Sequence, residues 1–127
     1  MPDIQPTSVE LRMPSDPQLL RVLRLVGSGL ASLGHLDLAG TEEVRLAIDE
    51  LGASLIAMGD GGPIDLTFEL TLDALCIQGV ATLPDGASLD IDPLTDRVME
   101  AVASAHSWTM DGRRAVGRVE KHLTRPG

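Results

Sequence analysis

An acidic pair followed by a serine lies in the middle of an amphipathic segment, residues 44–54, and is the clearest candidate for chemistry in the chain. Glu50 and Ser54 are four residues apart, so in a helix they share one face and lie one turn from each other. A carboxylate and a small oxygen donor placed in this way can flank a bound Mg²⁺-nucleotide or contact a partner protein. Asp49 and Glu50 can also be simple solvated helix charges, and the sequence leaves these three roles open.

The composition is that of one globular domain, which we place at residues 1–127. Hydrophobic residues at 43% and charged residues at 23% are ordinary values for a folded chain. The net charge is −9, with one Trp, one Phe and no Tyr. This argues against direct nucleic-acid binding, because phosphates would be repelled and bases would find few stacking platforms. The charge suits a basic partner protein, or it merely keeps the protein soluble.

Cysteine and histidine offer no obvious metal site. Cys76 is the only cysteine, which excludes an intrachain disulfide and a CxxC site, and its apolar surroundings favour a buried, inert thiol over a nucleophile. Three histidines are scattered without cysteine or carboxylate partners at ligand spacing: His35, His106 and His122. Because no basic, apolar leader and no run of about 18 apolar residues is present, we expect a cytoplasmic protein without a membrane segment.

The periodicity of the apolar residues predicts the element order β-α-α-β-β-α-β-β. Alternating apolar residues predict strands, and apolar residues three and four apart predict helices. Thr41 is the expected N-cap of the second helix, and the third helix is expected to bury Leu94, Val98, Ala101 and Val102. We therefore predict a two-layer α/β sandwich, with three helices on one face of a mixed, mainly antiparallel sheet. The expected ranges are strand 8–13, helix 17–33, helix 42–58, strand 64–72, strand 75–83, helix 94–105, strand 107–110 and strand 115–122.

The element order and the segment 46–50, which reads LAIDE, resemble the small anti-sigma factor/serine kinase family of the GHKL, or Bergerat-fold, ATPase superfamily. Members of that family have a strand ending near a proline, a helix carrying an arginine, a helix that reads roughly L-A-[VI]-D-E-x-x-x-N, and then a hairpin. The resemblance implies a Bergerat-like, histidine-kinase-like ATPase domain. It also implies that Glu50 matches the glutamate that orients or activates the attacking hydroxyl.

Other positions of the nucleotide site depart from the family pattern. Ser54 stands where the family has an asparagine that coordinates Mg²⁺, and Ala81 is nearest to an aspartate that holds the adenine amino group. The glycine-rich phosphate turn is missing, because residues 92–95 read DPLT. An adenine-holding carboxylate is worth about 1.5–3 kcal/mol, and phosphoryl transfer depends on positioning and on charge neutralisation by the metal. We therefore expect a degenerate ATP site, a vestigial Glu50 and no cofactor; ATP and Mg²⁺ would bind only if the site still functions.

The resemblance implies a transcription regulator that sequesters an alternative RNA polymerase sigma factor and is relieved by a STAS-type anti-anti-sigma protein. An acidic domain would gain association rate on the basic, DNA-contacting surface of such a partner. The expected partner-binding residues are Arg21, Arg24, Glu42 and Glu43, although the two arginines also fit a solvated helix face. Family members act as homodimers, which the resemblance implies for this chain as well.

Two other functions remain open. One is an active ATP-dependent serine kinase that phosphorylates its STAS-type partner, using Glu50 and a modified Mg²⁺ site around Ser54. The other is a stand-alone regulatory module whose partner is a different enzyme. Binding of Mg²⁺-ATP separates the kinase from a protein that acts only by binding.

Overall fold

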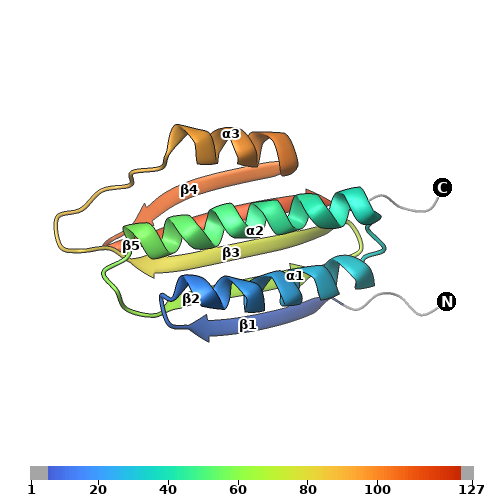
Figure 1. The fold of residues 1–127 in the computed structure, drawn as a ribbon, viewed down its shortest axis with the longest axis horizontal. Helices are drawn as coiled ribbons and strands as arrows, with labels where there is room; N and C mark the ends of the chain where they lie inside the picture. The colour runs from blue at the N-terminus through green and yellow to red at the C-terminus, as the bar shows by residue number, and fades with distance from the viewer. Residues whose placement is uncertain (1–5, 124–127) are drawn as a thin grey trace.

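The computed structural model of this chain describes residues 6–123, and the element order predicted from the sequence is confirmed within that range (Figure 1). Among these residues no helix is both long and apolar enough to cross a lipid bilayer. The elements are β1 (Thr7–Met13), the short 3-10 helix η1 (Pro17–Leu19), α1 (Leu20–Leu33), α2 (Leu38–Met58), β2 (Ile64–Leu70), β3 (Ala74–Thr82), α3 (Pro93–Val102), β4 (Ala105–Asp111) and β5 (Arg114–His122).

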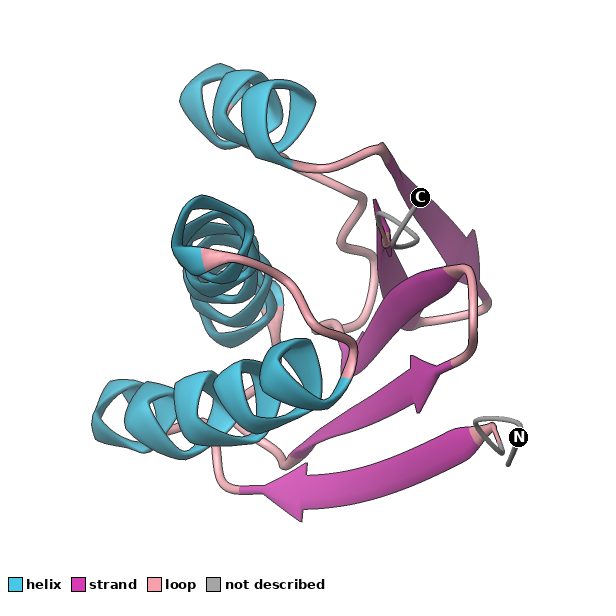
Figure 2. Cartoon of the chain, turned by 90° about the vertical axis from the view of Figure 1, so that its right-hand side faces the viewer, coloured by secondary structure: helices cyan, strands magenta, loops and turns pink. Residues whose placement is uncertain are grey.

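The five strands form one open sheet in the order β1-β2-β3-β5-β4, and the three helices cover one face of it (Figure 2). The predicted two-layer α/β sandwich is therefore confirmed. Every strand pair is antiparallel, so the sheet is not mixed. Two connections explain this. The helices α1 and α2 form a hairpin that returns the chain to β2 in the reverse direction, and β5 inserts between β3 and β4, which point the same way (Figure 1).

The core lies between α2 and the middle of the sheet. The strict alternation of β2 buries all four of its apolar side chains, Ile64, Leu66, Phe68 and Leu70. The neighbouring strands carry glycines at paired positions, Gly79 on β3 and Gly117 on β5. Leu51 of α2 packs over both of them, and it is 1% exposed. The absence of a side chain at these two positions lets α2 lie close to the sheet.

The helices α1 and α2 pack closely because each has a glycine at the contact. A Cβ atom added at Gly27 of α1 would collide with the side chain of Ile48, and one at Gly52 of α2 would lie 2.5 Å from Leu20 Cδ2. Gly29, by contrast, faces open space. Of the two glycines in α1, only Gly27 therefore has a packing role.

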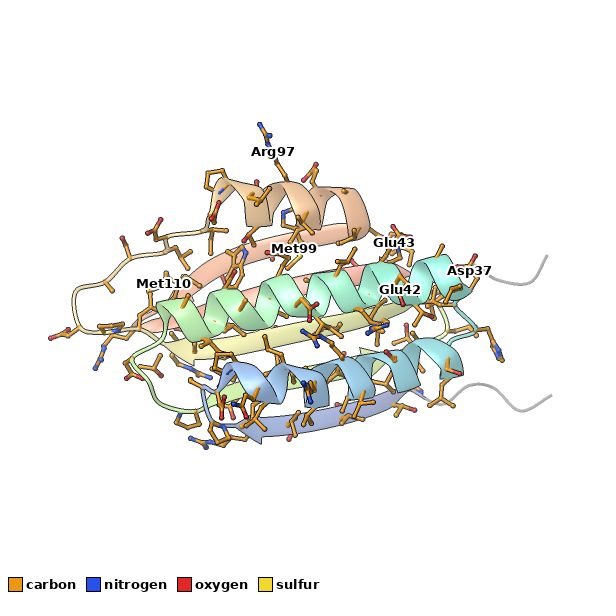
Figure 3. All side chains as sticks on the ribbon, viewed as in Figure 1. Asp37, Glu42, Glu43, Arg97, Met99 and Met110 are labelled. Carbon is orange, nitrogen blue, oxygen red and sulfur yellow. The ribbon has the colours of Figure 1, made fainter. Side chains whose placement is uncertain are left out.

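Three local expectations are wrong. The third helix was expected to reach residue 105, but α3 ends at Val102 and Ala105 begins β4. The helix α2 begins at Leu38, and its N-cap is Asp37 (Figure 3). Asp37 Oδ1 accepts a 2.8 Å hydrogen bond from the Gly40 backbone N–H, and Thr41 lies inside the helix. In α3 the expected buried face is rotated, because Leu94 is 65% exposed and Ala101 is exposed as well. The buried residues of α3 are Thr95 and Met99, which share one face four residues apart.

Candidate functional site

Glu50, for which the sequence analysis expected the position of a catalytic glutamate, accepts a hydrogen bond from a side chain of α3. The hydroxyl of Thr95 donates a 2.9 Å hydrogen bond to Glu50 Oε2. Thr95 is 8% exposed, and Met99 one turn later is 1% exposed and belongs to the main hydrophobic core (Figure 3). The helices α2 and α3 are therefore linked at Glu50 by a hydrogen bond, and Met99 anchors α3 in the hydrophobic core.

Asp49, the other member of the acidic pair, contacts α1 and not α3. Arg24 of α1 donates through Nε to Asp49 Oδ1 at 2.5 Å, and both side chains are about one third exposed, at 35% each. Adjacent residues on a helix are about 100° apart, so Asp49 reaches α1 while Glu50 reaches α3. The two carboxylates consequently do not form a joint acidic site; each one links α2 to a neighbouring helix.

Ser54 and Ala81, the positions expected at the Mg²⁺ and adenine sites, lack the carboxylate and amide groups that the family pattern has there. Ser54 is half-buried on α2, one turn beyond Glu50. Ala81 of β3 is 1% exposed and belongs to the hydrophobic core. Its methyl group cannot accept a hydrogen bond from an adenine amino group. Within residues 6–123 no group of three or more His, Cys, Asp or Glu side chains is arranged to hold a metal ion.

The N-terminus of α3 is occupied by one of its own side chains. Asp92 is the N-cap, and its Oδ1 accepts a 2.8 Å hydrogen bond from the Leu94 backbone N–H. The backbone donors and the dipole at a helix N-terminus are what binds a phosphate at such a position. Here a carboxylate already takes that place, and Asp96 adds a second negative charge in the first turn.

The four expected partner-binding residues fall into two groups. Arg21 and Glu42 are exposed, and Glu42 accepts a 2.8 Å hydrogen bond from Arg45 one turn along α2. Arg24 forms the ion pair with Asp49. Glu43 Oε2 lies 3.4 Å from Lys121 Nζ, so Glu43 forms an ion pair with a residue of β5. Figure 3 shows Glu43 beside Glu42 on α2. Arg21 and Glu42 are therefore the members of the set best placed to meet another protein.

Two exposed leucines lie on the same helices as Arg21 and Glu42, and the sequence analysis did not select them as partner-binding residues. Leu25 of α1 is 73% exposed and Leu46 of α2 is 48% exposed. By helical periodicity each lies on the side of its helix opposite the core, Leu25 opposite Leu23 and Leu46 opposite Leu55. The sequence contained the pattern that identifies them as exposed, because both leucines fall outside the apolar stripe of their helix. We call Arg21, Leu25, Glu42 and Leu46 the outer helical face.

Two further titratable groups lie away from the ion pair of Asp49 and the hydrogen bond of Glu50. His106 of β4 lies 2.9 Å from Asp96 Oδ1 and 4.0 Å from Glu100 Oε2, both on α3, a proximity that the spacing of these residues in the sequence did not reveal. Cys76 lies on the face of the sheet that the helices do not cover. Burial, and then the charge of Glu120, raise the pKa of the Cys76 thiol, while Arg118 lowers it. A raised pKa makes the thiol a poor nucleophile near neutral pH.

The fold and the site together define an open antiparallel α/β sandwich whose central helix is tied to both of its neighbours through an acidic pair. Compared with known families and with curated proteins, the chain matches no family model and no curated sequence.

Proposed function

We propose that this chain is an anti-sigma factor-like regulatory protein, with a Bergerat-like fold, that acts by binding and does not transfer phosphate. The observation that carries the proposal is the hydrogen bond from Thr95 to Glu50. A catalytic glutamate must face the reacting hydroxyl and the nucleotide. Glu50 instead accepts a hydrogen bond from a buried hydroxyl of α3, which stabilises a closed contact between α2 and α3.

The order of the elements supports the family assignment within this proposal. The strand β1 ends at Met13, directly before Pro14, and α1 carries Arg21 and Arg24. The LAIDE segment lies on α2 and is followed by the hairpin of β2 and β3. This is the arrangement that the resemblance implies, with Ser54 and Ala81 as the points of departure.

The partner that fits this protein is a sigma factor, with a STAS-type protein as the competitor that releases it. The outer helical face combines two exposed leucines with a cation and an anion, a composition typical of protein–protein interfaces with an apolar centre and a charged rim. The net charge of −9 would speed association with the basic, DNA-contacting surface of a sigma factor.

A pull-down from native cells, followed by binding measurements with the sigma factor that co-purifies, tests the partner surface. The double substitution Leu25→Ser/Leu46→Ser and the charge reversal Arg21→Glu should each weaken the complex. The matched control is Arg97→Glu, because Arg97 is an exposed cation on α3 and points away from the other helices (Figure 3). Equal affinity for all of these variants, or the absence of any sigma factor among the captured proteins, would contradict the proposal.

Calorimetry with Mg²⁺-ATP tests the non-catalytic assignment. We expect no heat of binding at millimolar nucleotide. Binding at low micromolar affinity, or phosphate transfer to a STAS-type protein that Glu50→Gln abolishes, would replace the proposal by the serine-kinase alternative.

A further inference from the structure

The strand β4 is an edge of the sheet to which another extended segment can be added. Within residues 6–123 it pairs only with β5, and it is the uppermost strand in Figure 1, with α3 above it. An edge strand presents a row of backbone N–H and C=O groups that can pair with another chain. The sequence of β4, AHSWTMD, contains no proline and no lysine, two residues that commonly block such pairing. The outward-facing backbone groups of β4 can therefore form a further ladder.

A groove lies on the helix side of this edge, between β4 and the start of α3. It has a volume of about 490 Å³, and its apolar lining comes from Ile91, Pro93 and Trp108. The Trp108 ring packs on β5, because a Cβ atom added at Gly117 would lie 2.7 Å from Trp108 Cζ3. The side chain is nevertheless only half-buried, so it offers a fixed aromatic surface to an incoming apolar side chain. We call this hollow the α3/β4 groove.

The side chains of β4 alternate between the two faces of the sheet. Met110 lies on the helix face, because its cross-strand partner Ala115 is fully buried in the core. Trp108 and His106 follow on the same face, two and four residues earlier. A strand added antiparallel to β4 would therefore meet the exposed Met110 first, then Trp108 and then His106.

The charges around this edge are almost all negative. Residues 84–111 contain six of the 19 acidic residues and a single arginine, Arg97, which points away from the other helices (Figure 3). The carboxylates of Asp96 and Glu100 lie 2.9 Å and 4.0 Å from the ring of His106, and their side chains are 64% and 80% exposed. A carboxylate accepts several hydrogen bonds, so both can still bind a cation. This edge thus suits a basic segment and repels a second copy of this acidic chain.

We propose that the β4 edge and the α3/β4 groove bind an extended basic segment of a partner protein, which joins the sheet as an antiparallel strand. At every second position the segment carries an apolar residue opposite Met110, an apolar residue opposite Trp108, and a lysine or arginine opposite His106. The cation there lies beside the two carboxylates of α3. Backbone hydrogen bonds along the edge supply affinity, and the alternating side-chain contacts supply specificity.

The antiparallel direction is the one that the sheet favours. Every ladder between its strands is antiparallel, and parallel pairing is slightly less stable per residue. The direction fixes the order in the partner segment, with the two apolar residues before the cation.

This inference concerns a different surface from the outer helical face and does not rest on the proposed function. The outer helical face lies on α1 and α2, whereas the α3/β4 groove lies between α3 and β4. Binding of a basic peptide in the groove and binding of a sigma factor are therefore separate experimental results.

Fluorescence titration of the full chain with the synthetic peptide KVTVTRT tests the proposal. The peptide has seven residues, like β4, and places its lysine opposite Asp111, its valines opposite Met110 and Trp108, and its arginine opposite His106. Trp108 is the only tryptophan, so binding should shift its emission until the site is saturated. The control peptide EVTVTET, with glutamates in place of both cations, should give no shift. No saturable shift with the basic peptide, or the same shift with both peptides, would overturn the proposal.

Methylation of backbone nitrogens in the peptide tests the strand pairing. Successive N–H groups of an extended segment point to opposite edges. One peptide carries N-methyl groups at its odd positions and a second at its even positions. We expect one of the two to lose binding and the other to keep it. Equal affinities for the two methylated peptides would show that the segment does not add to the sheet as a strand.

A pair of charge variants of the protein tests the acidic side of the groove. Glu100→Lys should raise the Kd of the basic peptide about fivefold. The matched control is Glu10→Lys, because Glu10 is an exposed glutamate on β1, at the opposite edge of the sheet. It should leave the Kd unchanged at about 0.15 M salt, where charges more than about 8 Å apart are largely screened. Equal Kd values for the two variants would contradict the assignment of the basic segment to α3 and β4.

Discussion

Gly79 of β3 and Gly117 of β5 are direct cross-strand partners, and Leu51 of α2 packs over the gap that they leave. A Cβ atom at Gly117 would lie 2.6 Å from Leu51 Cδ1 and 2.7 Å from Trp108 Cζ3. One at Gly79 would lie 3.6 Å from the same leucine atom. The closeness of α2 to the sheet, and with it the height of Glu50 above the sheet, therefore depends on these two positions.

Gly117→Ala is expected to destabilise the fold by about 1–3 kcal/mol, because the added methyl group must displace both Leu51 and the Trp108 ring. Urea unfolding measures the loss. Trp108 is the only tryptophan, so its fluorescence emission should shift in the folded variant. A variant with the wild-type midpoint and the wild-type emission would show that the site has room for a side chain.

Gly27→Ala and Gly29→Ala, two positions apart in α1, should act in opposite directions. At Gly27 the new methyl group meets Ile48, whereas at Gly29 it meets nothing within 4 Å. Gly29→Ala should stabilise the protein by about 1 kcal/mol through helix propensity, and Gly27→Ala should lower stability despite the same propensity gain. Thermal unfolding of the two variants checks the difference, and a similar Tm for both would contradict it.

Thr95→Val should weaken the contact between α2 and α3 by about 0.5–1.5 kcal/mol, because it keeps the shape of the side chain and removes the donor to Glu50. Thr95→Ser keeps the hydroxyl and is the matched control for the hydrogen bond. A double-mutant cycle with Glu50→Ala should give a coupling energy of about 1 kcal/mol. A coupling energy near zero would mean that the hydrogen bond does not hold α3 in place.

Cys76 should react slowly with iodoacetamide at pH 8, relative to a small-molecule thiol, because burial and then Glu120 raise its pKa. Glu120→Gln should speed the reaction and Arg118→Gln should slow it, since the two charges act in opposite directions. Rates measured from pH 7 to pH 10 give the pKa directly. Identical rates for both variants would exclude electrostatic control of this thiol.

The raised pKa of Cys76 also makes the free energy of unfolding depend on pH. The thiol keeps its proton to higher pH in the folded state than in the unfolded chain, so the folded state binds more protons once the pH exceeds the ordinary cysteine pKa. The contribution of Cys76 to stability is therefore present below that pKa and is lost as the pH rises through the raised one. Cys76→Ser should remove this part of the alkaline loss of stability in urea titrations.

Much of the fold could be predicted from the sequence, because the determinants of its elements are local. The alternation in β2 fixed which side chains are buried, since successive residues of a strand face opposite sides of the sheet. In α2 the apolar spacing likewise identified five core positions, Val44, Ile48, Leu51, Leu55 and Met58. The first four are buried and Met58 is half-buried. The helical hairpin of α1 and α2, and the antiparallel pairing of β1 with β2 that it produces, come from the structure, since the sequence analysis expected a mixed sheet.

The burial of α3 could not be predicted in the same way. Its sequence offers apolar residues on more than one side, and the face that turns inward depends on what lies beneath it. Thr95 is buried because Glu50 is within reach of its hydroxyl, whereas Leu94, the more hydrophobic residue, remains exposed. Thr95 shares its face with Met99, which belongs to the hydrophobic core, and the hydrogen bond to Glu50 removes the cost of burying an unpaired hydroxyl.

For the candidate site too, some features follow from the sequence and others only from the tertiary structure. The sequence by itself determined that an acidic pair lies on the central helix and that the chain is strongly acidic. The loss of the metal, adenine and phosphate contacts at Ser54, Ala81 and the DPLT segment stays a prediction from the resemblance. Only the tertiary structure decided that Asp49 pairs with Arg24 while Glu50 pairs with Thr95. Helical periodicity gives the direction of each carboxylate, but its partner comes from a helix at least 25 residues away in sequence, and only packing brings those helices together.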